Sequence, residues 1–124
     1  MQKISKNYRE LFDVSFCLEV SEYWYDPMMA LKNIAKLLKQ GGLLYITFHF
    51  LYPIHEPKEQ DCLRYTRFGV EKLLKHAGFT IEDVLVRTEV EARFLEYCAA
   101  EKMRPAKTYN QHNGVGYCVT AKKL

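Results

Sequence analysis

The sequence lacks several features that would place it in a specialised class of protein. Its 124 residues contain no apolar run near the ~20 residues that a membrane-spanning helix needs. Its polar start, MQKISKNYRELFD, has no apolar core of the kind that a secretory signal carries. The net charge of +3 is too small to indicate a nucleic-acid-binding protein. These absences predict a cytoplasmic protein that binds neither membrane nor nucleic acid.

The four cysteines lack the paired CxxC spacing that indicates a metal or redox site. They are Cys17, Cys62, Cys98 and Cys118. A disulfide framework needs a secreted, oxidising setting, which the start of the sequence does not indicate. Cys17 and Cys118 also lie in apolar runs, where cysteine acts as a small hydrophobic residue. We therefore expect reduced, structural thiols.

No repeat or Pro/Gly/Ser-rich linker divides the chain, and 48% of its residues are hydrophobic. This composition predicts one packed domain over residues 1–124. The mostly apolar run over residues 12–20, FDVSFCLEV, predicts a largely buried strand. Asp26 and Pro27 are typical of a helix start, and the apolar stripe that follows is Leu31, Ile34, Ala35 and Leu38.

Gly41-Gly42 is expected to end this helix, and residues 43–50, LLYITFHF, predict a second strand. A strand, a helix and a strand joined in this way predict two parallel strands. The later elements are expected to be a helix capped by Thr66 and ending at Gly78, a strand over residues 79–88, a helix over residues 90–103 and a final strand over residues 115–121. The fold class is therefore α/β.

In an open α/β sheet, ligands bind beyond the carboxyl ends of the parallel strands. The chain leaves the first two strands at residues 19–25 and 49–55, so that edge should gather Glu19, Glu22, Tyr23, His49 and His55. The long connection over residues 50–65 is aromatic and charged, which favours a functional loop. The structural alternatives are a hydrogen-bonded core role for His49 and a bracing pair between Asp61 and Arg64. Because His49, His55 and Glu56 have no compact ligand spacing, we expect no metal.

Two segments resemble a known family. The first, FDVSFCLEVSEYWYDPMMALKNIAKLLKQGGLLYITFHF, contains the turn Glu19-Val20-Ser21-Glu22-Tyr23 and the helix end Leu38-Lys39-Gln40-Gly41-Gly42. The second is LYPIHEPKEQDCLRYTRFGVEKLLKHAGF. Together they resemble the second half of class I S-adenosylmethionine-dependent methyltransferases of the type 11 group, over residues 11–84. The resemblance implies a partial Rossmann-like sheet made of the fourth to seventh family strands, the last antiparallel, with flanking helices.

The resemblance also implies roles for particular residues. The methionine end of S-adenosylmethionine would be bordered by Cys17, Leu18, Glu19 and Glu22. The residues that would line or brace the methyl-acceptor side are His49, Tyr52, Asp61, Arg64 and Tyr65. Tyr23 would stand beside the transferring methyl group, and His55 is the candidate general base, held by a carboxylate such as Asp61. We expect a small-molecule acceptor of unknown identity, and the mild positive charge and aromatic loop fit a lipid head group or a sugar equally well.

The sequence departs from this family in two ways. Tyr23 stands where the group usually has histidine, which puts any proton transfer by that histidine in doubt. The family's glycine-rich cofactor loop and first strand are absent from these 124 residues, and Gly114-Val115-Gly116 precedes a predicted strand and cannot replace the loop. We therefore expect an incomplete, truncated domain that binds S-adenosylmethionine weakly or not at all by itself. A non-catalytic module for dimerisation or protein binding is the alternative.

The predicted strand over residues 12–20 would also lack a neighbour on one side. An exposed apolar edge strand is a feature that soluble proteins normally avoid. We therefore expect a missing N-terminal segment or a second copy of the chain to pair with it. A homodimer through this strand is one expected outcome.

Overall fold

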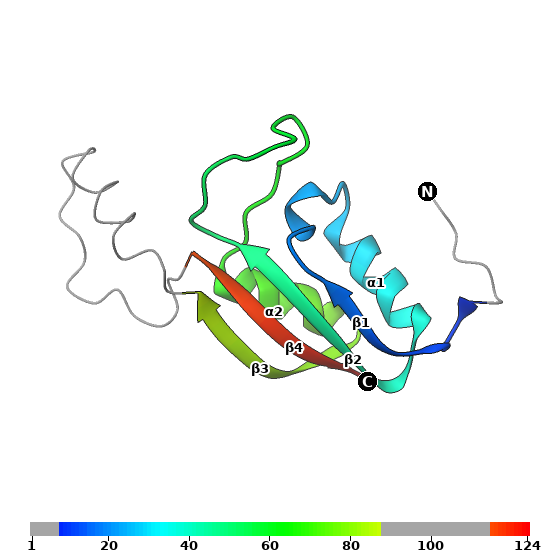
Figure 1. Cartoon of the computed structure of the whole chain (residues 1–124). Coiled ribbons are helices and arrows are strands. Elements are labelled where there is room, and N and C mark those ends of the chain that lie inside the picture. The colour runs from blue at the N-terminus through cyan, green and yellow to red at the C-terminus, as the bar shows by residue number, and fades with distance from the viewer. Residues whose placement is uncertain (1–7, 88–114) are drawn as a thin grey trace.

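The computed structural model describes residues 8–87 and 115–124 (Figure 1). The described elements follow in the order β1 (Phe12–Cys17), the 3-10 turn η2 (Ser21–Tyr23), α1 (Pro27–Leu37), β2 (Leu38–His49), α2 (Arg67–His76), β3 (Phe79–Arg87) and β4 (Gly116–Lys123). The helix expected over residues 90–103 lies outside the described residues. The remaining expected elements are all present.

The four strands form one sheet in the order β1-β2-β4-β3. β1 pairs in parallel with β2, with Val14 beside Leu43 and Cys17 beside Ile46. β4 lies between β2 and β3 and is antiparallel to both. This arrangement confirms the predicted parallel strand–helix–strand unit, the antiparallel last strand and the α/β fold class.

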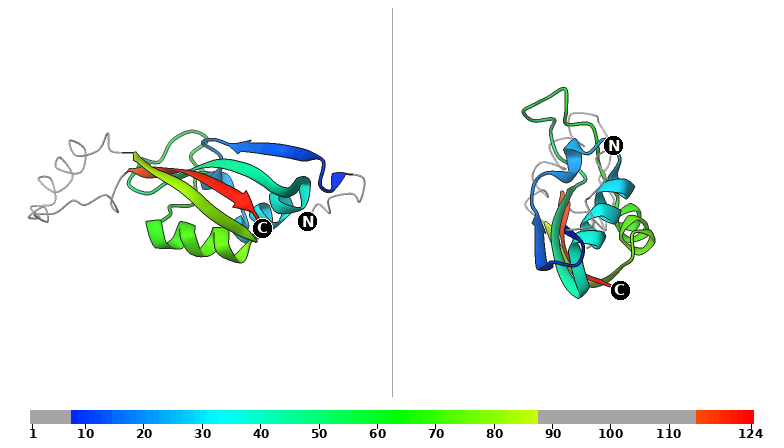
Figure 2. Two further views of the ribbon diagram at one scale, coloured as in Figure 1. Left: turned by 90° about the horizontal axis from the view of Figure 1, so that it is seen from below. Right: turned by 90° about the vertical axis from the view of Figure 1, so that its right-hand side faces the viewer.

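Both helices cover the same face of the sheet (Figure 2). Their buried side chains pack against the central strands because each helix is apolar along one stripe only. The core contains Leu31 of α1, Leu44, Ile46 and Phe48 of β2, Val70 and Leu74 of α2, Phe79 of β3, and Tyr117, Val119 and Ala121 of β4. The helical layer and the neighbouring strands β1 and β4 therefore hold β2, and with it the end of β2, in a fixed place.

Both predicted helix starts are confirmed by their caps. The Asp26 carboxylate accepts a hydrogen bond of 2.9 Å from the Met29 N–H, and Pro27 occupies the first helical position. The Thr66 hydroxyl accepts a hydrogen bond of 3.1 Å from the Gly69 N–H. Each side chain satisfies a backbone donor that has no partner within its own helix.

The predicted end of the first helix is wrong. α1 ends at Leu37, and the fully buried Leu38 already has extended backbone and pairs with Phe12. Gly41 has a φ of +76° within β2. A Cβ atom on Gly42 would lie only 2.9 Å from the Lys39 carbonyl oxygen. The two glycines therefore let the chain bend and pack closely at the start of β2, instead of capping the helix.

The prediction of a largely buried strand over residues 12–20 is also wrong in two respects. β1 ends at Cys17, and most of its side chains are exposed, with Phe16 68% accessible. β1 is an edge strand, and no described residue pairs with its outer side. The exposed apolar edge expected from the sequence is therefore present among the described residues. Other exposed apolar residues in and just after β1 are Phe12, Val14, Leu18 and Val20.

Two smaller expectations concern membranes and thiols. Neither α-helix in the described part of the chain is long and apolar enough to cross a membrane. Cys17, Cys62 and Cys118 are free thiols, and Cys98 lies outside the described residues.

Gly116 is the glycine on which the pairing of β2 with β4 depends most. It lies opposite His49 in the register, and a Cβ atom there would lie 2.3 Å from the Phe48 carbonyl oxygen. We predict that Gly116→Ala lowers the free energy of unfolding by about 3 kcal/mol, because the added methyl group forces two paired strands apart. Urea denaturation followed by circular dichroism measures this change. Lys122→Ala, an exposed position on the same strand, should change stability by less than about 0.5 kcal/mol, and equal effects of the two substitutions would contradict the packing argument.

Candidate functional site

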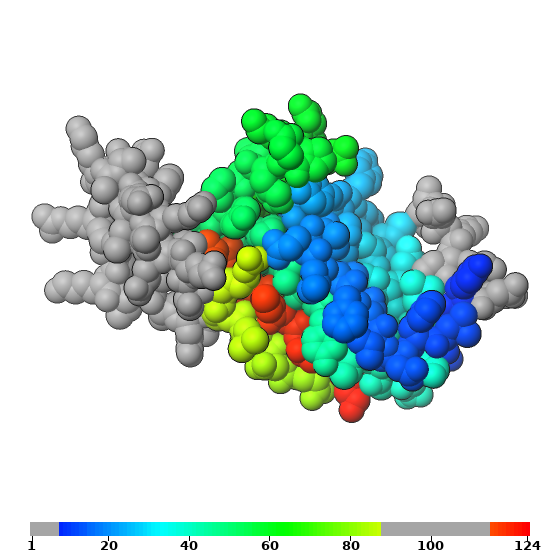
Figure 3. Space-filling model, in the orientation of Figure 1, coloured from blue at the N-terminus to red at the C-terminus, as the bar shows by residue number. Residues whose placement is uncertain are grey.

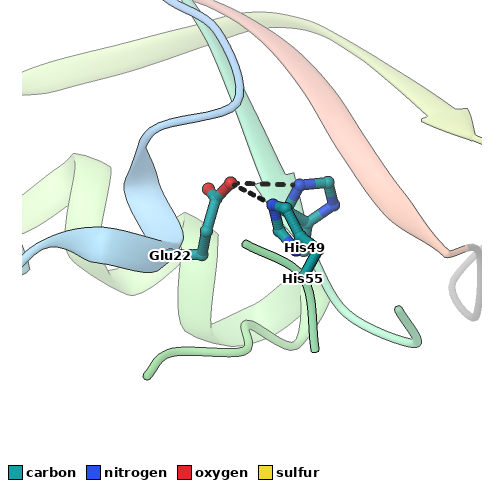
Figure 4. Close-up of side chains that lie close together, drawn as sticks. All are labelled: Glu22, His49 and His55. Carbon is teal, nitrogen blue, oxygen red and sulfur yellow. Dashed lines mark ion pairs between the residues drawn. The ribbon is translucent and has the colours of Figure 1, made fainter. Parts of the chain in front are cut away.

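Three separate segments place polar side chains together where β1 and β2 end (Figure 4). The chain leaves β1 and forms the turn η2, which carries Glu22. His49 is the last residue of β2, and the following loop returns His55 to the same place. One ligand atom from each of Glu22, His49 and His55 lies within 4.8 Å of the others. The convergence predicted from parallel strand ends is therefore present.

Glu22 lies at the centre of this cluster and is fully buried. Its Oε1 atom lies 3.3 Å from His49 Nε2 and 3.3 Å from His55 Nε2. Neither carboxylate oxygen of Glu22 has a hydrogen-bond partner in the part of the chain that the structure describes. An ionised carboxylate is costly to bury unless a positive group is paired with it. The cluster therefore requires a proton or a cation between Glu22 and the two imidazole rings.

The turn that carries Glu22 is held by its own hydrogen bonds. The Ser21 hydroxyl donates to the Thr47 carbonyl oxygen at 2.8 Å, and both residues are buried. The Glu22 carbonyl oxygen accepts hydrogen bonds of 3.1 Å from the Cys62 and Leu63 N–H groups. η2 is thus fixed to β2 on one side and to the end of the 50–65 loop on the other. Neither Ser21 nor Thr47 was among the site residues predicted from the sequence.

Glu19 joins the cluster from its exposed side. Its Oε2 atom lies 2.9 Å from His49 Nε2, and its Oε1 atom accepts a hydrogen bond of 2.8 Å from Arg87 Nη1. The Glu19 backbone has a φ of +54°, and its N–H donates to Thr47 Oγ1 at 2.6 Å. Arg87 was not predicted as a site residue. It is the last residue of β3, which runs in the same direction as β2, so that both strands end at the same edge of the sheet. Its position at the end of a predicted strand was the signal that could have identified it.

Asp61 and Arg64 form the bracing pair that their spacing suggested. The Arg64 guanidinium donates to both Asp61 carboxylate oxygens, with Nη2 at 2.8 Å from Oδ2. Arg64 also donates to the carbonyl oxygens of Tyr52, Pro53 and Leu63. Its donors are therefore engaged within the loop, and the structure gives it a bracing position.

Asp61 also orients His55. Asp61 Oδ2 lies 3.0 Å from His55 Nδ1 and accepts a 3.0 Å hydrogen bond from the His55 backbone N–H. The Arg64 hydrogen bonds hold the pKa of the Asp61 carboxyl well below its usual range, against the opposing effect of burial. An ionised Asp61 favours a proton on His55 Nδ1, and the other ring nitrogen then faces Glu22. The expected support of His55 by Asp61 is present in the geometry.

Three tyrosines surround the cluster in different ways. Tyr52 stacks on His49 with ring centroids 4.4 Å apart. The Tyr23 hydroxyl donates to the Glu56 carbonyl oxygen at 2.9 Å, and desolvation together with the Glu22 and Asp61 carboxylates raises the pKa of Tyr23. The Tyr65 hydroxyl donates to the buried Ser21 carbonyl oxygen at 2.6 Å, and burial raises the pKa of Tyr65. Tyr23 and Tyr65 are therefore neutral phenols that tie the loop to η2.

The remaining residues expected near a cofactor lie at the end of β1. Cys17 is half-buried, and burial raises the pKa of its thiol. This thiol therefore stays protonated at neutral pH and has the character of a small packing residue. Leu18 follows it and is exposed. Cys17 and Leu18 lie beside the cluster in the chain, and neither contributes an ion pair to it.

We predict that Asp61→Asn lowers the free energy of unfolding by about 3 kcal/mol at neutral pH, because it leaves Arg64 without a charged partner. The folded-state pKa of Asp61 is depressed, so its stabilisation is present above the unfolded-state pKa of about 3.9 and is lost as the pH falls further. Urea titrations between neutral pH and pH 3 should show a smaller acid dependence in the variant. Asp83→Asn on exposed β3 is the control, and an unchanged acid dependence in Asp61→Asn would contradict this account.

Comparison with known proteins shows which domain and which fold the chain resembles. Residues 4–46 match the model of a family described as a methyltransferase domain. No curated protein matched the chain. The matched segment contains β1, η2, α1 and most of β2, which are the elements that carry Glu19 and Glu22 to the sheet edge.

Solved structures share the fold over nearly the whole chain. An S-adenosylmethionine-dependent methyltransferase from Mesorhizobium loti has a TM-score of 0.62 at 15% identity, over 93% of this chain and 64% of that one. A similar enzyme from Methanosarcina mazei has a TM-score of 0.61 at 15% identity, over 94% and 61%. The [4+2]-cyclase SpnF has a TM-score of 0.63 at 20% identity, over 97% and 52%.

This chain therefore spans less than two thirds of the length of these structures. At such low identity their likeness shows the fold, and the cyclase shows that the fold carries more than one chemistry. Residues 4–46 therefore resemble a methyltransferase domain, and the chain shares the fold of part of the S-adenosylmethionine-dependent methyltransferases.

Proposed function

We propose that this chain forms the methyl-acceptor side of an S-adenosylmethionine-dependent methyltransferase domain. The observation that carries the proposal is the buried cluster of Glu22, His49 and His55 at the carboxyl ends of two parallel strands. Open α/β sheets bind their ligands at that edge.

The described residues fit only one side of the cofactor. β1 is an open edge strand, and the Glu19 carboxylate is engaged by Arg87 and His49. These 124 residues contain no Gly-x-Gly-x-Gly loop, whose backbone could approach the adenosine of the cofactor closely. We therefore propose that Cys17, Leu18, Glu19 and Glu22 border the methionine end, and that residues beyond this sequence or on a partner hold the adenosine. The chain alone should bind S-adenosylmethionine weakly or not at all.

The chemistry left to this chain is the positioning and deprotonation of an acceptor. When bound, S-adenosylmethionine supplies an electrophilic methyl group on a sulfonium. His55 Nδ1 lies 3.0 Å from the Asp61 carboxylate, and we propose that His55 Nε2 takes a proton from an acceptor hydroxyl or amine. Tyr52, at 5.4 Å from the His55 ring and stacked on His49, offers an aromatic surface beside that atom. The acceptor class that we propose is a small molecule.

We predict that His55→Gln lowers the rate of methyl transfer about 100-fold or more in a completed enzyme, because it removes the general base. A completed enzyme is made by fusing the glycine-loop part of the Mesorhizobium loti methyltransferase in front of Tyr8. Calorimetry measures S-adenosylmethionine binding, and transfer of a labelled methyl group to a panel of small phenols, alcohols and amines measures activity. S-adenosylmethionine binding should be unchanged by His55→Gln, since His55 lies on the acceptor side.

The matched control is His76→Gln, which replaces an exposed histidine at the end of α2. It should leave both binding and transfer unchanged. Transfer at the parent rate in His55→Gln would remove His55 from its role. A fused chain that folds but binds no S-adenosylmethionine would contradict the proposed function as a whole.

The exposed edge strand favours a second candidate function, a non-catalytic module that pairs with another chain. β1 presents Phe12, Val14 and Phe16 to solvent, and Phe16 stacks on Tyr45 with ring centroids 5.2 Å apart. Edge strands that stay exposed pair readily with other strands. A second copy of this chain is the simplest partner, because two β1 edges could pair across a two-fold axis.

We predict that the 124-residue chain forms dimers in sedimentation velocity experiments and that Val14→Lys shifts them to monomers. Lysine on an edge strand opposes strand pairing through its charge. Tyr25→Lys is the control, since Tyr25 is fully exposed outside β1, and it should leave the dimer intact. A chain that is folded and monomeric at every concentration would exclude the pairing module.

A further inference from the structure

We infer that Glu22, His49 and His55 form a binding site for one divalent transition-metal cation of the zinc type. The sequence spacing of the histidines did not predict such a site, because its three ligands come from η2, from the end of β2 and from the following loop. In the folded chain their ligand atoms all lie within 4.8 Å of one another. The inference concerns cation binding and does not depend on methyl transfer.

The first argument is distance. Bonds of about 2.0–2.1 Å from zinc to each ligand atom place neighbouring ligand atoms of a tetrahedral site about 3.3 Å apart. Glu22 Oε1 lies 3.3 Å from both His49 Nε2 and His55 Nε2. The same carboxylate oxygen therefore faces two imidazole nitrogens at the separation that a shared zinc ion would impose. Figure 4 shows both ring nitrogens directed at that oxygen.

The second argument is the unmet need for positive charge. Glu22 is fully buried and His49 is almost fully buried. Neither Glu22 oxygen has a hydrogen-bond partner among the described residues, and the same holds for His49 Nδ1, whereas His49 Nε2 lies 2.9 Å from Glu19 Oε2. Buried polar atoms are normally satisfied. A divalent cation would supply the buried Glu22 carboxylate with a positive partner, whereas an apolar side chain in its place would not.

The third argument is the carboxylate behind His55. Asp61 Oδ2 lies 3.0 Å from His55 Nδ1, on the side of the ring away from Glu22. Histidines that bind metal usually donate their other ring N–H to a carboxylate, which fixes the ring and makes it a better ligand. Asp61 is itself fixed by Arg64. This orientation gives His55 Nε2 a lone pair directed toward the cluster.

The donor set selects the cation. Two imidazoles and one carboxylate favour zinc and its neighbours over magnesium or calcium, which prefer oxygen ligands. Three protein ligands leave a fourth position open, as in metal sites that bind a substrate or water. Glu19 Oε2 lies beside His49 at 2.9 Å, but Glu19 also holds Arg87 and is half exposed, so we place it outside the three ligands.

A bound cation would change the proposed role of His55. With His55 Nε2 bound to the metal, proton loss from an acceptor would follow from the lowered pKa of an oxygen on the open position. That consequence rests on the proposed function. Metal binding by the three residues does not.

The test is a titration of the metal-free 124-residue chain with zinc chloride by calorimetry and with cobalt chloride by visible absorption. We expect one zinc per chain with a micromolar or tighter dissociation constant, proton release on binding, and the visible bands of a four-coordinate cobalt site. Glu22→Gln and His55→Gln should each weaken binding at least 100-fold. Asp61→Asn should weaken it about 10- to 100-fold, and His76→Gln should not change it.

Circular dichroism is recorded for each variant before titration. If the buried substitution Glu22→Gln unfolds the chain, His55→Gln decides the question, because His55 is partly exposed. Folded parent chain that shows neither heat with zinc nor cobalt bands would overturn the inference. Binding that survives both ligand substitutions and is lost in His76→Gln would overturn it too, by placing the metal elsewhere. Neither titration contains S-adenosylmethionine or an acceptor, so its outcome is separate from that of the methyl-transfer assay.

Discussion

The burial of the Glu22 carboxylate constrains everything around it. Its oxygens face two imidazole rings, and its backbone carbonyl accepts the Cys62 and Leu63 N–H groups. The Tyr65 N–H donates to the His49 carbonyl oxygen at 2.8 Å, which closes the 50–65 loop over the end of β2. A long polar loop is thus held in one place by hydrogen bonds to η2 and β2. This anchoring brings His55 and Asp61 to a site whose other members lie on η2 and at the end of β2.

Much of the fold follows from local patterns in the sequence. Asp26 and Thr66 specify helix starts, because each side chain accepts a hydrogen bond from a backbone N–H three residues later. The helical spacing of apolar residues specifies which face of each helix is buried. The end of α1 could not be read in the same way. Gly41 and Gly42 suggest a helix cap, but the burial of Leu38 and its pairing with Phe12 draw the chain into the sheet earlier. Tertiary packing overrode a local signal there.

The sequence was enough to predict where in the fold the candidate site lies, but not how its side chains are arranged. Parallel strands bring Glu19, Glu22 and His49 to one edge whatever the side chains do. The position of His55 depends on a loop whose conformation rests on Asp61, Arg64 and Tyr65 together, and no single spacing encodes it. The proposed cation site of Glu22, His49 and His55 was not predicted, because its ligands are far apart in the sequence and meet only when the loop is folded. Arg87 was missed because its relation to Glu19 spans 68 residues.

The account's central claim is that the ends of β1 and β2 and the 50–65 loop bring His49, His55 and Tyr52 into contact in the folded chain. Nuclear Overhauser effects between ring protons test this directly, because such effects report only short distances. The account predicts cross-peaks between the His49 and His55 rings, whose centroids are 5.5 Å apart, and between the His49 and Tyr52 rings at 4.4 Å. Rings that show contacts only with their own sequence neighbours would contradict it.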